Sequence, residues 1–141
     1  MTAPVTCAVR AGAAYFAIIF ALGFALGTIR VTLIEPRLGI GPATLIELPV
    51  MLGTSWIVCG WLVRRCNVPA NISARTAMGA TAFTLLMLGE LGISLFVFGR
   101  TTAEHFAVYR EPAKQLGLAA QLLFASYPLV RLYAIPSESS A

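Results

Sequence analysis

The sequence predicts an all-α fold, an integral membrane bundle of four transmembrane helices that forms a single membrane domain over residues 1–141. Two observations support this prediction. Of the 141 residues, 58% are hydrophobic and only 11% are charged, whereas a soluble domain carries about 25% charged residues. Short polar segments also separate four apolar runs, each long enough for the roughly 20-residue helix that crosses a bilayer. The expected spans are 11–34, 42–63, 76–99 and 115–135.

The first span runs without a break from Ala11 to Ile34. A cleaved signal peptide is the alternative, but its apolar core would be about 7–15 residues long and a small-residue cleavage site would follow. Here the run is longer and continues into TIRVTLIEP, where no such site follows. An uncleaved helix is therefore favoured. Within it, Gly23 and Gly27 form a small-xxx-small pattern, which is typical of helix packing in membranes.

A tight connection is expected directly after this span, in the segment EPRLGIG. Glu35, Pro36 and Arg37 would form its turn, because proline fixes a backbone dihedral angle and the two glycines that follow allow positive ones. The second span then contains Pro49. A proline inside a membrane helix either kinks it or is accommodated by neighbouring helices.

The loop between the second and third spans indicates the orientation. Arg64, Arg65 and Arg75 are basic, and no acidic residue lies between them, so the positive-inside rule places this loop in the cytoplasm. With four spans, both termini then lie in the cytoplasm as well. The total number of basic residues discriminates only weakly between the two sides. The predicted location is therefore a cell membrane, with the chain crossing it four times.

The third span carries Glu90, and a longer loop of mixed charge follows it. Its amphipathic spacing predicts that part of it forms a short helix at the membrane interface. Glu111 and Pro112 precede the fourth span and echo the Glu-Pro pair that precedes the second. Either a duplicated hairpin or the turn chemistry of membrane re-entry explains this echo. In the fourth span, Arg131 is placed to reach the inner interface, and a short polar tail, 136–141, is expected to be disordered.

Ionisable residues inside a membrane span are costly, and they indicate a functional site by default. Arg30, Glu47 and Glu90 are of this kind. A helical rise of about 1.5 Å per residue places them about 6, 8 and 13 Å below the outer ends of their spans. Gln121 lies about 10–12 Å deep by the same rise. We therefore expect these four residues to meet in one polar layer in the outer half of the bundle.

Two functions for this layer stay open. One arginine and two carboxylates leave a surplus negative charge, which a proton or a bound cation would compensate. The layer would then be an outer-half site for transport or sensing of a cation, a proton or a small polar ligand. Alternatively, Arg30 and Glu47 form an ion pair that only specifies helix packing, or each reaches separately to the interface, and Glu90 is satisfied by Gln121, Ser94 or a water molecule. The chain would then be a structural or accessory membrane subunit.

Other classes of site have no support in the sequence. The motifs GxSxG, HExxH and GxxxxGK[ST] are absent, so no catalytic residue is assigned and no enzymatic activity is expected. Cys7, Cys59 and Cys66 lack metal-binding spacing, and His105 is expected in a solvated loop, so neither a metal nor a cofactor is predicted. No basic patch indicates nucleic acid. The expected partner is the lipid bilayer, and so small a core is compatible with a homo-oligomer or a membrane partner.

Four segments of the chain, GTIRVTLIEPRLG, ATLIELPVML, GELGISLFVFGR and YREPAKQLG, resemble a group of short four-helix bacterial inner-membrane proteins that has no assigned activity. The resemblance covers nearly the whole chain and implies the four-span topology and an inner-membrane location. Small multidrug transporters are less similar, because they have a glutamate deep in the first span where this chain has an arginine. The most specific positions are Arg30, Glu35, Pro36, Glu47, Pro49, Glu111 and Pro112.

Overall fold

The structure is a computed structural model that describes residues 3–134, and almost all of this range is helical. Four of its helices are long and apolar enough to cross a membrane, which confirms the all-α bundle and indicates a multi-pass membrane protein. The expected end of the fourth span at Ile135 and the tail 136–141 lie outside the described residues. The long helices are α1 (Ala3–Ile29), α3 (Ile40–Arg65), α4 (Ile72–Phe96) and α6 (Pro112–Ala134).

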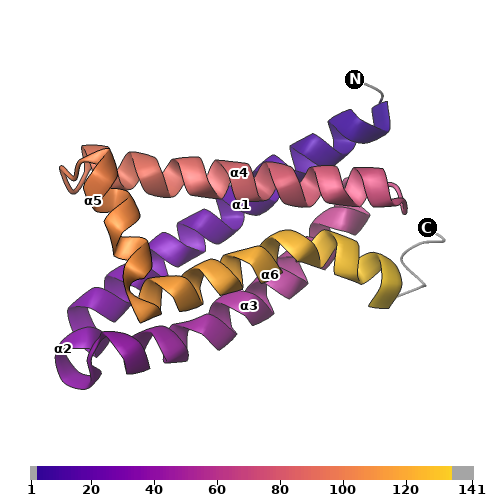
Figure 1. Ribbon diagram of the computed structural model, residues 1–141. Helices are drawn as coiled ribbons and strands as arrows, with labels where there is room; N and C mark the ends of the chain where they lie inside the picture. Colours follow the sequence, from indigo (N-terminus) through magenta and orange to yellow (C-terminus); the bar gives the residue numbers. More distant parts are fainter. Residues whose placement is uncertain (1–2, 135–141) are drawn as a thin grey trace.

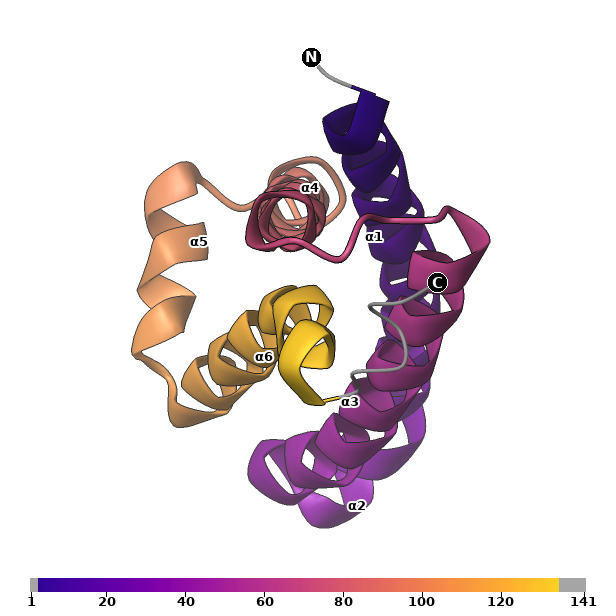
Figure 2. The same cartoon turned by 90° about the vertical axis from the view of Figure 1, so that its right-hand side faces the viewer.

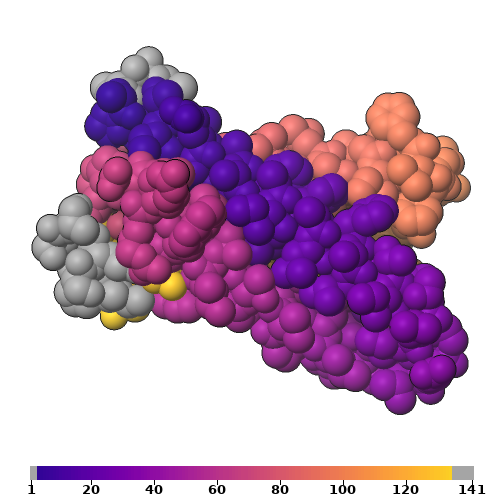
Figure 3. All heavy atoms as spheres, turned by 180° about the vertical axis from the view of Figure 1, so that it is seen from behind, coloured from indigo at the N-terminus to yellow at the C-terminus, as the bar shows by residue number. Residues whose placement is uncertain are grey.

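The four long helices form a ring in which α1 and α6 each pack against both α3 and α4 (Figure 2). The start of α1 and the end of α6 lie at one end of the bundle (Figure 1). At the other end lie α2 (Glu35–Leu38) and α5 (Thr102–Ala107), and α5 continues through the 3-10 turn Val108–Arg110 into α6. Figure 3 shows the opposite face, over which α1 lies diagonally.

The outer surface of the bundle is apolar, as contact with lipid requires. Each long helix turns large hydrophobic side chains outward. The side chains buried between the helices are smaller on average, and alanines from α1, α3 and α4 are among them. This pattern suits a bilayer, in which close packing of small residues holds the helices together. Examples of outward side chains that are at least half exposed are Leu45, Ile57, Leu88 and Leu122.

The first connection differs from the prediction. α1 continues through a π-helical turn, Arg30–Ile34, into α2, so Glu35, Pro36 and Arg37 lie on a helix. The predicted turn at these residues is wrong, because the helix continues through Pro36, and the π-helical turn lies directly before this proline, which cannot donate a helical hydrogen bond. The chain reverses only at Gly39, whose φ of 86° favours glycine.

The remaining boundaries also differ from the expected ones: α3 extends further at both ends, to Ile40 and Arg65, whereas α4 both begins and ends earlier, at Ile72 and Phe96. α1 begins at Ala3, and α4 begins after Asn71, whose side chain accepts a 2.8 Å hydrogen bond from the N–H group of Ala74. The short helix expected after the third span is present as α5, which a capping box at Thr101 starts. Pro49 lies inside α3, as predicted.

The glycines that allow close helix packing are not the predicted pair. A methyl group added at Gly27 would meet no atom within 4 Å, and one at Gly23 would meet only the end of a flexible side chain. At Gly12 and Gly79, in contrast, an added methyl group would overlap the backbone of the neighbouring helix, at Gly79 the carbonyl oxygen of Ala125. The closest contacts therefore join α1 to α4 and α4 to α6.

Candidate functional site

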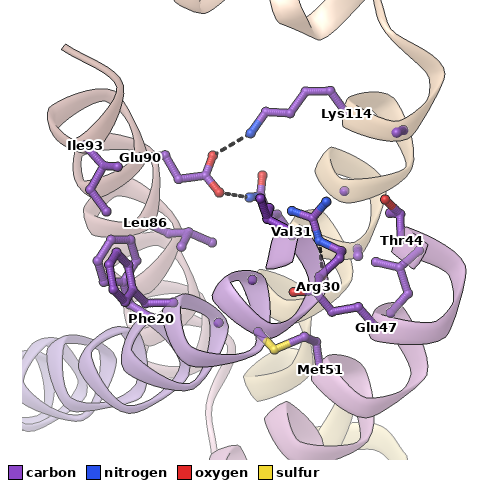
Figure 4. Close-up of a pocket in the computed structure, with 18 of the residues that line it drawn as sticks. Phe20, Arg30, Val31, Thr44, Glu47, Met51, Leu86, Glu90, Ile93 and Lys114 are labelled. Atoms are coloured by element: carbon purple, nitrogen blue, oxygen red, sulfur yellow. Dashed lines mark hydrogen bonds and ion pairs between the residues drawn. The ribbon is translucent and has the colours of Figure 1, made fainter. Parts of the chain in front are cut away.

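A cavity of about 810 Å³ lies between the four long helices, near the end where α2 and α5 are found. Its lining includes Arg30, Glu47, Glu90 and Gln121, so the structure brings the four predicted polar residues to one cavity. Figure 4 shows that they belong to two clusters, with Arg30 and Glu47 on one side and Glu90 on the other.

The first cluster places one guanidinium group between two carboxylates. Arg30 Nη1 pairs with Glu35 Oε1, and Arg30 Nε lies 2.5 Å from Glu47 Oε2 on α3. The π-helical turn explains the first pair: its i to i+5 geometry also brings the N–H group of Glu35 to the carbonyl oxygen of Arg30. All three side chains are between 18% and 25% exposed. One carboxylate in this cluster therefore has no cation of its own.

The second cluster joins α4 to α6. Glu90 accepts a hydrogen bond from Gln121 Nε2 through one oxygen and lies 3.0 Å from Lys114 Nζ through the other. Lys114 was not among the predicted site residues, because the last helix was expected to start only after it. Pro112 was the available signal, since proline is common at the first position of a helix. From that start, Lys114 and Gln121 lie seven residues apart on one helical face.

The ion pair between Lys114 and Glu90 determines where the surplus negative charge of the cavity lies. With Glu90 paired to a lysine, the excess carboxylate lies beside Arg30. With His105 neutral, four acidic and three basic residues give the cavity lining a formal charge of −1, although the whole chain carries +4. The charged residues in the lining are Glu35, Glu47, Glu90, Glu111, Arg30, Arg100 and Lys114.

Two polar atoms in the cavity lining have no hydrogen-bond or ion-pair partner among residues 3–134. They are Ser94 Oγ and Gln121 Oε1, and both are buried; a third buried atom, Arg30 Nε, makes no hydrogen bond but lies in the ion pair with Glu47. Ser94 is only 4% exposed. A buried polar group without a partner costs about 1–3 kcal/mol, so these two atoms are suited to contact with a ligand.

The rest of the wall is mainly apolar. Phe20, Leu86 and Met51 line it from α1, α4 and α3 (Figure 4). Phe124 lines it from α6, and its ring stacks on Tyr15 with ring centroids 4.1 Å apart. The site thus combines a few charged groups with a large apolar surface, as small-molecule sites do.

α5 covers one side of the cavity and buries the only histidine. His105 is 6% exposed, so the prediction that it lies in a solvated loop is wrong. Its ring packs edge-to-face against Phe106 and Tyr109. Burial raises the pKa of the Tyr109 hydroxyl group; the neighbouring ammonium group of Lys114 opposes this shift, and the carboxylate of Glu90 adds to it.

Two arginines at the other end of the bundle are buried. Arg75, which is fully buried, donates hydrogen bonds of 3.2 Å to the carbonyl oxygens of Pro69 and Pro128. Arg131 is 5% exposed, donates to the carbonyl oxygen of Trp56, and lies 4.2 Å from the centre of its ring. The expectation that Arg75 lies in the loop and Arg131 reaches the interface is therefore wrong. Of the three basic residues that predict the orientation, only Arg64 and Arg65 are exposed.

The chain was compared with known families, proteins and structures. No family model, no curated protein and no solved structure matches it. The resemblance to short four-helix inner-membrane proteins therefore stays a prediction, and any functional argument must rest on the cavity and its residues.

Proposed function

We propose that this chain is an integral membrane protein that binds a small charged or polar ligand in the cavity and acts in its transport or sensing. The observation that carries this proposal is the cavity itself. Its volume, about 810 Å³, falls within the range of about 300–1,000 Å³ typical of small-molecule sites. Partnerless polar atoms and an uncompensated carboxylate line it, and no role as an enzyme is proposed.

We further propose an inner-membrane location with both termini in the cytoplasm, so that the cavity lies in the outer half of the bilayer. Arg64 and Arg65 support this orientation, because they are exposed at the end of α3, at the end of the bundle opposite the cavity. The proposed partner is the lipid bilayer, which the apolar outer surface supports. A homo-oligomer or a membrane partner is compatible with this surface.

Cysteine labelling tests whether the cavity is accessible to water, and from which side. The three native cysteines are replaced by alanine, and Ser94→Cys then introduces a thiol of similar size inside the cavity. We expect membrane-impermeant methanethiosulfonate reagents to modify this thiol when they are added to the outer side of intact cells. Reaction from the inner side alone would contradict the orientation. No reaction from either side of the membrane would contradict the ligand-binding proposal.

Leu88→Cys is the matched control for this experiment. Leu88 lies on the same helix and is more than half exposed on the outer surface. Within lipid its thiol would not ionise, and the thiolate is the reactive form. We therefore expect no reaction at this position from either side.

One observation favours the alternative, an accessory subunit in which the charges only specify packing. Each cluster bridges two helices, α1 to α3 through Arg30 and Glu47, and α4 to α6 through Glu90 and Lys114. If Glu47→Gln and Glu90→Gln mainly lower the melting temperature of the purified protein, and the Ser94→Cys thiol is inert, this alternative replaces the first. If both variants fold normally and abolish a proton- or cation-coupled signal in liposomes, the alternative fails.

A further inference from the structure

We infer that the ligand of this cavity is an organic cation with an apolar body. This inference rests on the proposed function and names the class of ligand that the site recognises. Three independent properties of the lining support it: the charge balance, the composition of the walls, and the chemistry of the partnerless polar atoms.

The charge balance favours a cation. Glu90 has its own lysine, whereas Glu35 and Glu47 share the single guanidinium group of Arg30. The rim adds one acidic and one basic residue, Glu111 and Arg100, so it does not change the sum. A ligand with one positive charge would neutralise the cavity, whereas an anion would increase its negative charge in a medium of low dielectric constant.

The walls favour a cation with an apolar body over a metal ion. Metal ions such as Ca²⁺ require about 6–8 oxygen ligands, but the carboxylates of Glu47 and Glu90 are already engaged by Arg30 and Lys114. Most of the lining is apolar, and aromatic faces attract organic cations through their electron-rich surfaces. The phenylalanines that line the cavity are Phe20, Phe24, Phe98 and Phe124.

The partnerless atoms favour a ligand that donates hydrogen bonds. Gln121 donates a hydrogen bond to Glu90 through Nε2, and its Oε1 atom is an acceptor without a partner. Ser94 Oγ is also buried without a partner and can accept a hydrogen bond. An N–H group on the ligand cation could donate to these acceptors, and its positive charge would compensate the surplus carboxylate in the cluster around Arg30.

Two ions of matched size and opposite charge test this inference. Tetraphenylphosphonium and tetraphenylborate have the same shape and neither can donate a hydrogen bond, so the difference in their binding reports only the sign of charge that the cavity prefers. Binding of each radiolabelled ion is measured in phosphatidylcholine nanodiscs, with empty nanodiscs subtracted because both ions partition into lipid. We expect the phosphonium ion to bind at least about tenfold more tightly than the borate ion.

Glu35→Gln is the decisive variant, because it removes the surplus charge and leaves the ion pair between Arg30 and Glu47 in place. We expect it to weaken phosphonium binding about tenfold. Glu104→Gln is the matched control. Glu104 lies on α5 outside the cavity lining, and glutamine can replace glutamate in its capping box. This variant loses the same charge and is expected to bind the phosphonium ion as the native chain does.

Each contrary outcome overturns a specific step. Equal or tighter binding of the borate ion would overturn the cation class while leaving ligand binding intact. A failure of both ions to bind, with the Ser94→Cys thiol still accessible to water, would overturn the organic-cation class alone. Equal losses in Glu35→Gln and Glu104→Gln would show an effect of overall charge and overturn the assignment to this cavity. An inert Ser94→Cys thiol would instead overturn the proposed function.

Discussion

The hydroxyl group of Tyr15 on α1 donates a hydrogen bond of 2.9 Å to the carbonyl oxygen of Phe124 on α6. Pro128 lies four residues after Phe124 and has no N–H group, so this carbonyl lacks its usual donor within the helix. Tyr15 is completely buried. The hydroxyl group of Tyr15 thus supplies the hydrogen bond that Pro128 cannot give to the carbonyl oxygen of Phe124, a residue of the cavity wall.

Replacing Tyr15 with phenylalanine should lower the free energy of unfolding by about 1–3 kcal/mol, the cost of a buried carbonyl without a partner. Unfolding of the purified protein in detergent measures this loss. The second variant, Pro128→Ala, restores an N–H group to α6. We therefore expect Tyr15→Phe to cost less in a Pro128→Ala background, and equal losses in both backgrounds would contradict the role given to Pro128.

Gly79→Ala should lower the free energy of unfolding by about 1–3 kcal/mol, because the added methyl group overlaps the backbone of α6 at Ala125. Gly27→Ala, at the glycine of the predicted motif, should leave stability unchanged or raise it slightly, since its new methyl group meets no atom within 4 Å. Thermal unfolding of the two variants distinguishes the positions. Equal destabilisation by both would mean that α4 and α6 do not approach as closely as described.

Arg30→Gln should destabilise the fold more than Glu35→Gln does. The first variant leaves two carboxylates, those of Glu35 and Glu47, facing one another without a cation, whereas the second leaves one intact ion pair. We expect a difference of about 1 kcal/mol, because these side chains are partly exposed and solvent screens their charges. Denaturation of both variants in the same detergent measures it, and a larger effect of Glu35→Gln would contradict the shared arginine.

Tyr109 should ionise above pH 10, the ordinary pKa of its side chain, because burial raises this pKa in the folded protein. The stability that comes from the protonated phenol is therefore present below pH 10 and is lost as the pH rises through the folded-state pKa. Lys114→Met removes the charge that opposes this shift, so the pKa of Tyr109 should rise further. The tyrosinate absorbance, taken as the difference from Tyr109→Phe, measures both values.

Lys114→Arg is the control for this titration, because it keeps a positive charge near Tyr109. We expect the pKa of Tyr109 in the Lys114→Arg variant to stay close to its value in the native chain. If Lys114→Met lowers the pKa of Tyr109, the ammonium group does not act as described.

The sequence predicts the helices better than it predicts their ends. Four apolar runs mark the spans because lipid demands long hydrophobic segments. The boundaries near Glu35 and Pro112 differ because helices here continue into polar sequence, and the glutamate and the proline are both compatible with a first helical turn. Because the last helix was started too late, Lys114 was assigned to a loop and its pairing with Glu90 was missed.

The polar residues of the cavity could be predicted only in part. Depth placed Arg30, Glu47, Glu90 and Gln121 in one layer, since helical rise is regular, but it did not divide them into the two clusters that the structure has. Depth could not place Glu35, because its position beside Arg30 depends on a π-helical turn that apolar patterning does not reveal. His105 was missed for a different reason: its burial depends on the way α5 folds over the bundle, which is a tertiary contact.

The π-helical turn at Arg30–Ile34 is a place where the chain can lose one residue without losing its charge cluster. Such a turn holds one residue more than an α-helical turn does. Deleting Val31 would return this segment to the α-helical repeat, and the N–H group of Glu35 would still meet the carbonyl oxygen of Arg30. Glu35 would then stand four residues after Arg30, a spacing at which the two side chains still pair. A deletion within α3, in contrast, would rotate the later residues of that helix by about 100°, so Glu47 is the carboxylate of the pair that depends on chain length.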